Sequence, residues 1–177
     1  MVDVRKGFTI WFTGLSASGK STVAQGVHKF LAEKGYFVEV LDGDEVRKEL
    51  NYDLGFSKED RDTNIKRISF LTKILSRNGV VAVGAAISPY RELRQYARSL
   101  NKRFCEVYVD CPLEECIKRD PKGMYKKALA GEIKNFTGID DPYEAPEKPE
   151  LILETHRETP EESARRVIDK LVELKFM

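Results

Sequence analysis

The stretch Gly14-Leu15-Ser16-Ala17-Ser18-Gly19-Lys20-Ser21 decides the fold, because it matches the pattern G-x-x-x-x-G-K-[ST]. It follows an apolar, β-branched segment of strand length, residues 8–13, and it precedes apolar positions spaced as on one buried face of a helix. Those positions are Val23, Val27, Phe30 and Leu31. A strand, a glycine-containing loop and a helix in this order predict a loop that binds the phosphates of a nucleoside triphosphate.

The residue types within this loop fit that chemistry. Glycine lets successive backbone N–H groups turn toward phosphate oxygens, and the N-terminus of the following helix adds a partial positive charge. Lys20 can reach the β- and γ-phosphates, and the Ser21 hydroxyl is a hard oxygen ligand suited to Mg²⁺. A glycine turn that happens to precede Lys-Ser is the alternative interpretation.

The composition favours one domain in the cytoplasm. A chain of 177 residues can bury its own core, and its 30 basic and 29 acidic residues give no field for holding nucleic acid or an anionic membrane. No apolar run approaches the ~18 residues of a membrane span, and residues 1–7 lack the apolar core of a signal peptide. We expect reduced thiols in the core at Cys105, Cys111 and Cys116.

Strand-like runs alternate with helical patterns along the chain. The runs are residues 8–13, 37–41, 80–87, 104–109 and 151–153. This alternation predicts an α/β fold in which a parallel sheet carries helices on both faces. Residues 80–83 are apolar without alternation, so they belong near the centre of the sheet.

Several helix boundaries are marked by capping residues. Ser57 with Asp60 resembles a capping box, and Thr159 is followed by Pro160 and by glutamate at the third helical position. Ser88-Pro89 offers an N-cap followed by a proline at the first helical position. Gly79 can end the helix that precedes the strand-like run 80–87.

Residues 119–149 break the alternating pattern. The segment is charged, carries three glycines and ends in the proline-rich residues 141–149. Because too few apolar residues are present to root it in the core, we expect a surface excursion with a short helix around residues 124–130. In a phosphate-transfer enzyme such an excursion can close over the site as a lid, and a passive surface loop is the alternative.

Two carboxylates follow the second strand-like run, in Leu41-Asp42-Gly43-Asp44. The carboxyl edge of an α/β sheet is where ligands gather. One carboxylate can order Mg²⁺ through water while the other accepts a proton from an attacking hydroxyl. Asp44 can also cap a helix that begins near Glu45, which is compatible with a role as base.

Basic residues accompany an aromatic ring after this turn, within residues 43–67: Arg47, Phe56, Arg61, Lys66 and Arg67. Guanidinium groups bind charged oxygens and a ring face stacks on a base, so the pattern favours a small anionic substrate that carries a base. Further on, Arg91, Arg94 and Arg98 share one helix face and are interpreted mainly as solvated charge.

Longer matches carry a resemblance to a known family. They cover residues 41–47, 54–64, 87–91, 119–127 and 130–144, of which Phe136-Thr137-Gly138-Ile139-Asp140-Asp141-Pro142-Tyr143-Glu144 is the most specific. From Gly7 to the last helix, the chain resembles adenylylsulfate kinase, the P-loop enzyme that phosphorylates the 3′-hydroxyl of adenosine 5′-phosphosulfate in sulfate activation. The resemblance implies a single P-loop kinase domain over residues 1–177, with five strands in the order 2-3-1-4-5 and a mobile lid at about residues 119–149.

The resemblance also implies ligands and roles. ATP would bind Gly14, Ser16, Ala17, Ser18, Gly19, Lys20, Ser21, Thr22 and Arg119. The acceptor would contact Asp44, Arg47, Phe56, Arg61, Asn64, Ile87, Ser88, Lys122, Asn135 and Phe136, with its adenine between the two phenylalanines. Lys20, Asp42, Asp44 and Lys122 would be the catalytic groups. Ser21 and Asp42 would serve Mg²⁺ and Asp44 would be the base, although the two aspartates can exchange roles.

Ser88 matches a serine described in the family as a phosphoenzyme site. In-line transfer needs no covalent intermediate, so the helix N-cap is the favoured reading of Ser88. The chain departs from the family at Ala17, where glycine is frequent, and at Glu45, where asparagine is frequent. The first departure concerns the geometry of the phosphate loop, and the second concerns one contact to the substrate.

The resemblance also implies protein partners, and the motifs distinguish between alternative functions. Family members commonly form homodimers, and some are fused to or associated with ATP sulfurylase. A GTPase switch is disfavoured, because the D-x-x-G match at residues 120–123 follows a helix after the fourth strand and no Asn-Lys-x-Asp follows it. A kinase for another small nucleotide or metabolite is the stronger alternative, and the acceptor residues Phe56, Arg61, Asn64 and Phe136 discriminate against it.

Overall fold

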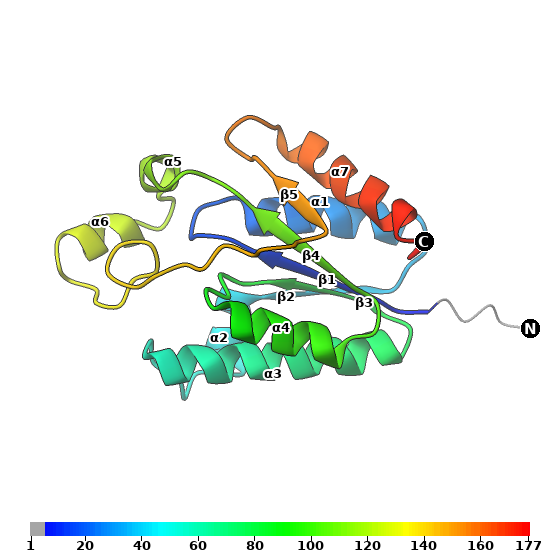
Figure 1. Cartoon of the computed structure of the whole chain (residues 1–177), viewed down its shortest axis with the longest axis horizontal. Coiled ribbons are helices and arrows are strands. Elements are labelled where there is room, and N and C mark those ends of the chain that lie inside the picture. The colour runs from blue at the N-terminus through cyan, green and yellow to red at the C-terminus, as the bar shows by residue number, and fades with distance from the viewer. Residues whose placement is uncertain (1–5) are drawn as a thin grey trace, which may run out of the picture.

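The computed structural model describes residues 6–177, which form a parallel sheet between layers of helices (Figure 1). The strands are β1 (Thr9–Thr13), β2 (Val38–Asp42), β3 (Val81–Ala85), β4 (Phe104–Val109) and β5 (Leu151–Leu153). Neighbouring strands pair in parallel in the order β2-β3-β1-β4-β5, which confirms the predicted sheet. The first five residues of the predicted domain, and with them most of the segment 1–7, lie outside the described residues.

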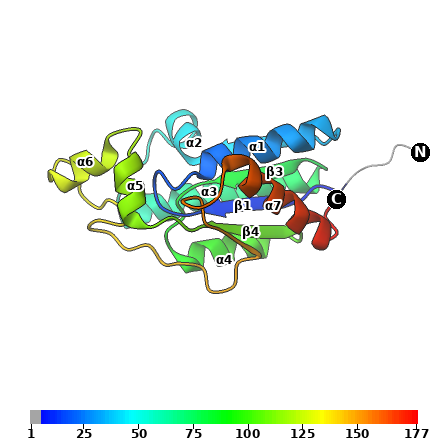
Figure 2. The same ribbon diagram turned by 90° about the horizontal axis from the view of Figure 1, so that it is seen from above.

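The helices cover both faces of the sheet, as expected. Helices α1 (Lys20–Glu33) and α7 (Pro160–Glu173) lie on one face, and α3 (Lys58–Arg77) and α4 (Arg91–Leu100) lie on the other (Figures 1 and 2). The short α2 (Gly43–Glu49) packs beside β2 and α3. Helices α5 (Leu113–Arg119) and α6 (Met124–Leu129) project beyond one end of the sheet (Figure 1). Within residues 6–177, no helix has the length and apolarity required to cross a membrane.

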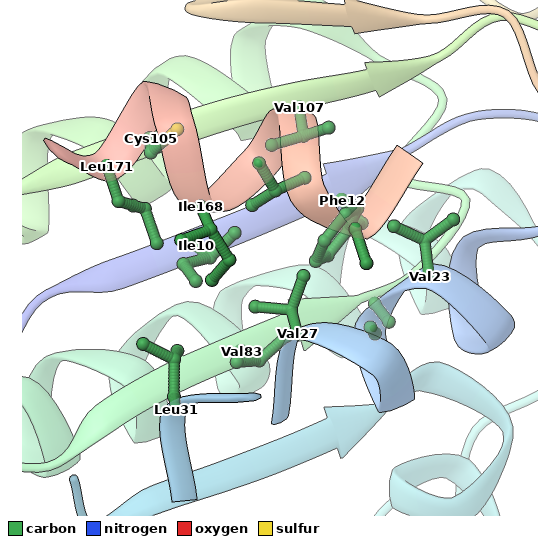
Figure 3. Close-up of a cluster of buried hydrophobic side chains, with 14 of the residues drawn as sticks. Ile10, Phe12, Val23, Val27, Leu31, Val83, Cys105, Val107, Ile168 and Leu171 are labelled. Atoms are coloured by element: carbon green, nitrogen blue, oxygen red, sulfur yellow. The ribbon is translucent and has the colours of Figure 1, made fainter. Parts of the chain in front are cut away.

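The main core lies between the sheet, α1 and α7 (Figure 3). Val23, Val27 and Leu31 are buried on one face of α1, as their spacing predicted. They meet strand residues such as Ile10 and Val83 from the central strands. The three cysteines are free and buried, which agrees with the prediction, and burial raises the pKa of the Cys105 thiol to about 12.

Local capping explains most helix boundaries. Ser57 and Thr159 begin α3 and α7 with the predicted capping boxes, and Gly79, with a φ of +86°, follows the end of α3. The predicted N-cap at Ser88 is wrong, because α4 begins at Arg91 with Tyr90 at the capping position. The chain leaves β3 after Ala85, two residues before the predicted end of that strand, and turns through Ser88 with a φ of +41°.

Arg94 of α4 is not solvated charge, which corrects the sequence interpretation, whereas Arg91 is exposed and Arg98 is partly buried. Arg94 is only 2% exposed and donates to Glu106, while Arg98 pairs with both Glu106 and Glu150. Arg91 donates to the Ala145 carbonyl over 2.8 Å. These contacts fasten α4 to β4 and to the chain that returns from the excursion.

The excursion at residues 119–149 has an apolar anchor that the composition did not indicate. Tyr125 is fully buried and Phe136 is 9% exposed, and both belong to a cluster with Cys111, Cys116 and Ala128. Leu15 of the phosphate loop packs against the same cluster. The expected short helix is present as α6, but the segment is rooted on the phosphate loop instead of lying loosely on the surface.

Candidate active site

One cavity of about 1100 Å³ joins the phosphate loop, the turn after β2, the turn after β3 and the excursion. It lies at the carboxyl ends of the central strands, where α/β folds bind ligands. Most of the predicted site residues line it: Ser16, Ala17, Gly19, Lys20, Ser21, Thr22, Asp42, Asp44, Arg47, Phe56, Arg61, Asn64, Ile87, Ser88, Arg119, Lys122, Asn135 and Phe136. The residues predicted to bind the donor and those predicted to bind the acceptor therefore line the same cavity.

Two predicted residues support the loop from beneath and do not line the cavity. Gly14 has a φ of +152°, and a Cβ there would stand 2.5 Å from the Val109 carbonyl oxygen, so a side chain is excluded. Ser18 is fully buried. Lys66 and Arg67 also lie outside the cavity, and Arg67 pairs with Asp53 on the surface.

Lys20 is held within the phosphate loop by main-chain oxygens. Its Nζ donates to the carbonyl oxygens of Gly14 at 3.0 Å and Leu15 at 2.6 Å. Burial lowers the pKa of Lys20 to about 8, and nearby Cys116, Asp44 and Asp42 limit the decrease. The ammonium group is therefore charged at neutral pH. It is also largely desolvated, so it can bind an anion with little further loss of water.

Ala17 adopts a backbone conformation that favours glycine. Its φ is +60°, and a non-glycine residue in the left-handed region costs roughly 1 kcal/mol. Its methyl group packs against the apolar cluster of the excursion. The Tyr125 hydroxyl donates to the Ser16 carbonyl over 2.9 Å, so the loop is held at the residue before Ala17. Alanine is thus accommodated at this position in a left-handed backbone conformation.

Asp42 and Ser21 bring two hard oxygens together below the loop. The Ser21 hydroxyl donates to Asp42 Oδ2 over 2.6 Å, and Asp42 Oδ1 accepts the Asp44 N–H at 3.0 Å. Asp42 is therefore the N-cap of α2, which corrects the expectation that Asp44 fills that position. A carboxylate and a hydroxyl in contact fit the oxygen preference of Mg²⁺.

Asp44 points its carboxylate at the excursion. Lys122 Nζ forms an ion pair with Asp44 Oδ2, and both side chains are largely exposed. Exposed ion pairs contribute little to stability, so a ligand can replace this one at small cost. Glu45, the other departure from the family pattern, is exposed and does not line the cavity.

The two predicted adenine-binding phenylalanines differ in their surroundings. Phe136 is nearly buried and packs edge-to-face on Tyr125 with ring centroids 5.0 Å apart. Phe56 is 57% exposed and lies under the Arg47 guanidinium, which stands 4.8 Å from its ring centroid. Burial and then neighbouring Arg61 lower the pKa of Arg47. Phe136 is therefore held by packing, whereas most of the Phe56 side chain is exposed.

Arg61 links α3 to the excursion. Its Nη1 donates to Thr137 Oγ1 at 2.7 Å and to Asp141 Oδ2 at 2.6 Å, and its Nη2 donates to the Asn135 carbonyl. Tyr90 donates a further hydrogen bond to Asp141. Asn64 is buried and accepts a hydrogen bond from Asn51 at 2.6 Å. The guanidinium of Arg61 therefore holds the predicted acceptor-binding turn in place.

Ser88 lies at the wall of the cavity with its hydroxyl engaged. It is 1% exposed, accepts from Trp11 Nε1 at 3.1 Å and donates to the Ala86 carbonyl at 3.4 Å. Ile87 is held by the Thr13 hydroxyl, which donates to its carbonyl over 2.7 Å. The buried hydroxyl of Ser88 serves the turn after β3 and does not begin α4.

Sequence and structure comparisons place this geometry among known enzymes. The family profile described as adenylylsulphate kinase matches residues 6–154. The chain belongs to the adenylylsulfate kinase family. The adenylyl-sulfate kinase of Halothermothrix orenii is 58% identical over 96% of this chain and 91% of its own length.

Two further adenylylsulfate kinase relatives are informative. The APS kinase of Mycobacterium tuberculosis, solved in complex with AMPPNP and APS, is 48% identical with a TM-score of 0.91 and covers 94% of this chain and 98% of its own. The probable bifunctional SAT/APS kinase 2 of Sorangium cellulosum is 55% identical over 97% of this chain, which corresponds to 29% of that protein.

Some residues that support the phosphate loop and the acceptor-binding turn were missed by sequence reasoning. Thr155 donates to the Ser18 carbonyl over 2.6 Å and accepts Arg119 Nη2 on its own carbonyl at 2.7 Å, so it braces the phosphate loop. No local pattern marks it. Thr137 and Asp141 lie in the specific stretch 136–144, which was a usable signal.

Proposed function

We propose that this chain transfers the γ-phosphate of ATP to the 3′-hydroxyl of adenosine 5′-phosphosulfate, forming 3′-phosphoadenosine 5′-phosphosulfate in sulfate activation. The observation that carries the proposal is the single cavity, in which a phosphate loop faces arginines and an aromatic pair. Family membership over residues 6–154 and the likeness to the M. tuberculosis enzyme support it.

In this proposal the phosphate loop holds the donor. Backbone N–H groups of residues 14–22 surround the phosphates, and the charged Lys20 neutralises the β- and γ-phosphate oxygens. Ser21 and Asp42 would hold Mg²⁺, which neutralises charge on the phosphates when bound. Arg119 lies beside the loop at the Thr155 carbonyl, where it can contact the nucleotide.

Asp44 is the proposed base. It is not consumed by helix capping, because Asp42 fills that role, and its carboxylate faces the cavity. Its present partner Lys122 is the proposed second cation for the transferring phosphoryl group. Exchanging this ion pair for substrates would place Asp44 at the acceptor hydroxyl and Lys122 at the phosphate.

The acceptor occupies the other half of the cavity in this proposal. Phe136 and Phe56 stack on the adenine, and Arg47, Arg61, Asn64 and Asn135 surround the ribose and phosphosulfate. Ile87 and Ser88 form the wall. A phosphoserine intermediate at Ser88 is not part of the proposal, because the buried hydroxyl already bonds Trp11 and Ala86.

We also propose a role for the excursion, a cellular location and an oligomeric state. The excursion at residues 119–149 acts as a lid that closes when both substrates are bound. The enzyme works in the cytoplasm as a homodimer, without nucleic acid or membrane partners, and light scattering tests the dimer. The bifunctional SAT/APS kinase relative from S. cellulosum supports a link to ATP sulfurylase.

A coupled assay of ADP release tests the function. Purified protein is incubated with ATP, Mg²⁺ and, in turn, adenylylsulfate, AMP, gluconate or shikimate. We expect turnover with adenylylsulfate that exceeds turnover with each other acceptor at least a hundredfold. Activity with AMP but not with adenylylsulfate would establish the alternative, a kinase for another small nucleotide or metabolite.

A further inference from the structure

Arg94 is a buried cation beside the acceptor half of the cavity, and the mechanism above does not use it. It is 2% exposed, and its Nε donates to Glu106 Oε1 over 3.0 Å. Its Nη1 donates to the Ser88 carbonyl over 2.6 Å, and its Nη2 donates to the Glu144 carbonyl. Because charge-assisted hydrogen bonds of a buried guanidinium are strong and costly to break, Arg94 restrains the two carbonyl groups to which it donates.

The two carbonyls belong to different walls of the site. Ser88 lines the cavity in a left-handed backbone conformation, with a φ of +41°. Glu144 lies in the chain that returns from the excursion, directly after Tyr143. The Glu144 N–H also donates to the Pro89 carbonyl over 2.9 Å, so these two segments touch next to Arg94. The guanidinium therefore joins the wall at Ser88 to the root of the excursion.

A second clamp lies parallel to the first. Thr13 donates to the Ile87 carbonyl over 2.7 Å, and its hydroxyl stands 2.9 Å from the Tyr143 hydroxyl. The Arg94 guanidinium stands 5.7 Å from the Tyr143 ring centroid. Residues 87–88 and 143–144 are thus tied together from β1 and from α4.

Arg98 provides a matched comparison one helical turn further along α4. It shares the partner Glu106 at 3.1 Å and pairs with Glu150 at 2.7 Å. It bonds neither Ser88 nor Glu144, and it does not line the cavity. Loss of Arg98 therefore perturbs the same ion network without releasing the cavity wall.

We propose that Arg94 is a positioning residue for the acceptor site. Its guanidinium fixes the position of the Ser88 peptide relative to the returning end of the excursion, and Glu106 is its counter-charge. This relative position sets the shape of the acceptor pocket. This inference rests on the proposed function only for the identity of the acceptor. The relative position of the two segments is a property of the fold and does not depend on the acceptor.

Hydrogen exchange tests, without any substrate, whether Arg94 fixes these two segments relative to each other. Exchange is followed by mass spectrometry in peptides covering residues 86–91 and 143–147, in wild type, Arg94→Gln and Arg98→Gln. We expect at least tenfold faster exchange of both peptides in Arg94→Gln, because the Glu144 and Arg91 amides lose their ordered acceptors, and little change in Arg98→Gln. Equal exchange of these peptides in the two variants would overturn the proposal.

Kinetics test the consequence for the acceptor. The KM for adenylylsulfate should rise about tenfold in Arg94→Gln, the effect of losing one charge-assisted hydrogen bond, while the KM for ATP stays within about twofold of wild type. Arg98→Gln should leave both constants near wild type. Equal changes in the two KM values, or an unchanged acceptor KM, would contradict a positioning role.

A conservative pair guards against misfolding. Arg94→Lys and Arg98→Lys keep the positive charge at each position, and lysine cannot bond two carbonyls and a carboxylate in the geometry of a guanidinium. If Arg94→Gln does not fold, the lysine pair decides, and Arg94→Lys should still show the larger exchange and the larger acceptor KM. Failure of wild type to use adenylylsulfate would refute the proposed function, whereas the exchange comparison would still test Arg94.

Discussion

The donor half and the acceptor half of this site are built in different ways. The donor half is centred on the backbone of one continuous loop, residues 14–21, with Lys20 fixed on two carbonyls of that loop, and Asp42 and Arg119 adjoin it from other elements. The acceptor half is made of side chains from α2, α3, the turn after β3 and the excursion. A local loop tolerates changes elsewhere, whereas an assembled pocket depends on the contacts that hold its pieces together.

The ties between the halves are few and specific. Tyr125 donates to the Ser16 carbonyl and packs on Phe136, so one side chain touches the donor loop and the acceptor clamp. Lys122 reaches from the excursion to Asp44 across the cavity. The comparison therefore predicts that substitutions in the chemical centre reduce kcat, while substitutions in the assembled wall mainly change the affinity for the acceptor.

Asp44→Asn carries the largest expected effect. The amide cannot accept the proton of the acceptor hydroxyl, so kcat should fall by about 10² to 10⁴. The isosteric amide keeps the shape of the side chain, and Glu45→Gln is a control on an exposed neighbour outside the cavity. Steady-state rates measure the change, and a loss below tenfold would assign Asp44 to positioning.

Lys20→Ala should reduce kcat by about 10² to 10³, the scale for removing one stabilising donor from a charged transition state. The affinity for adenylylsulfate, measured by calorimetry, should change little because Lys20 belongs to the donor half. Thermal unfolding of the variant controls for lost bonds within the loop. Unchanged turnover would remove the phosphate loop from the mechanism.

Phe136→Ala should weaken acceptor binding by about 1 to 3 kcal/mol, or roughly five- to 150-fold, as expected for the loss of a stacking partner. Phe56→Ala is the matched comparison and should cost less, because Phe56 is 57% exposed, whereas Phe136 is nearly buried against Tyr125. Calorimetric titration of both variants gives the difference. Wild-type affinity in Phe136→Ala would contradict the adenine clamp.

The affinity for ATP should decrease above about pH 8, by at most about tenfold per pH unit. Burial lowers the pKa of Lys20 to about 8, so the free protein carries this positive charge below that pH and loses it above. Titrations with AMPPNP between pH 7 and 10 measure the dependence. Flat affinity in wild type, as expected for Lys20→Ala, would show that the charge does not contribute.

Ala17→Gly should have the smallest effect. Glycine relieves the left-handed strain at φ +60°, but it also gains freedom in the unfolded chain and removes a packed methyl group, so stability should change by less than about 1 kcal/mol. Denaturant unfolding measures the stability, and kcat should stay within about twofold. A large loss of activity would mean that the alanine contact, and not the loop conformation alone, shapes the donor half.

The same contrast explains what the sequence could predict. The parallel sheet and the phosphate loop follow from local patterns, because strand periodicity and the glycine motif are set by neighbouring residues, whereas the strand order was implied by the family resemblance. The burial of Arg94 and the role of Ser88 were mispredicted, because both depend on partners at Glu106, Trp11 and Glu144 that are distant in sequence. Thr155 was missed for the same reason.

The proposed acceptor residues were predicted through family resemblance more than through local physics. Arg61 and Phe136 are 75 positions apart, and no periodicity connects them, yet both line the same cavity. The anchor at Tyr125 was not anticipated, because a few apolar residues within a charged segment can form a cluster only when another element, here the phosphate loop, completes it.

Phosphorus NMR of the reaction product tests the central claim most directly. The protein is incubated with ATP, Mg²⁺ and adenylylsulfate, and the purified product is examined for a new phosphomonoester coupled to the ribose 3′-position beside an intact phosphosulfate. The proposed function predicts this product in an amount equal to the ADP released. ADP without a 3′-phosphorylated product, or a phosphate attached to any other atom of the acceptor, would contradict it.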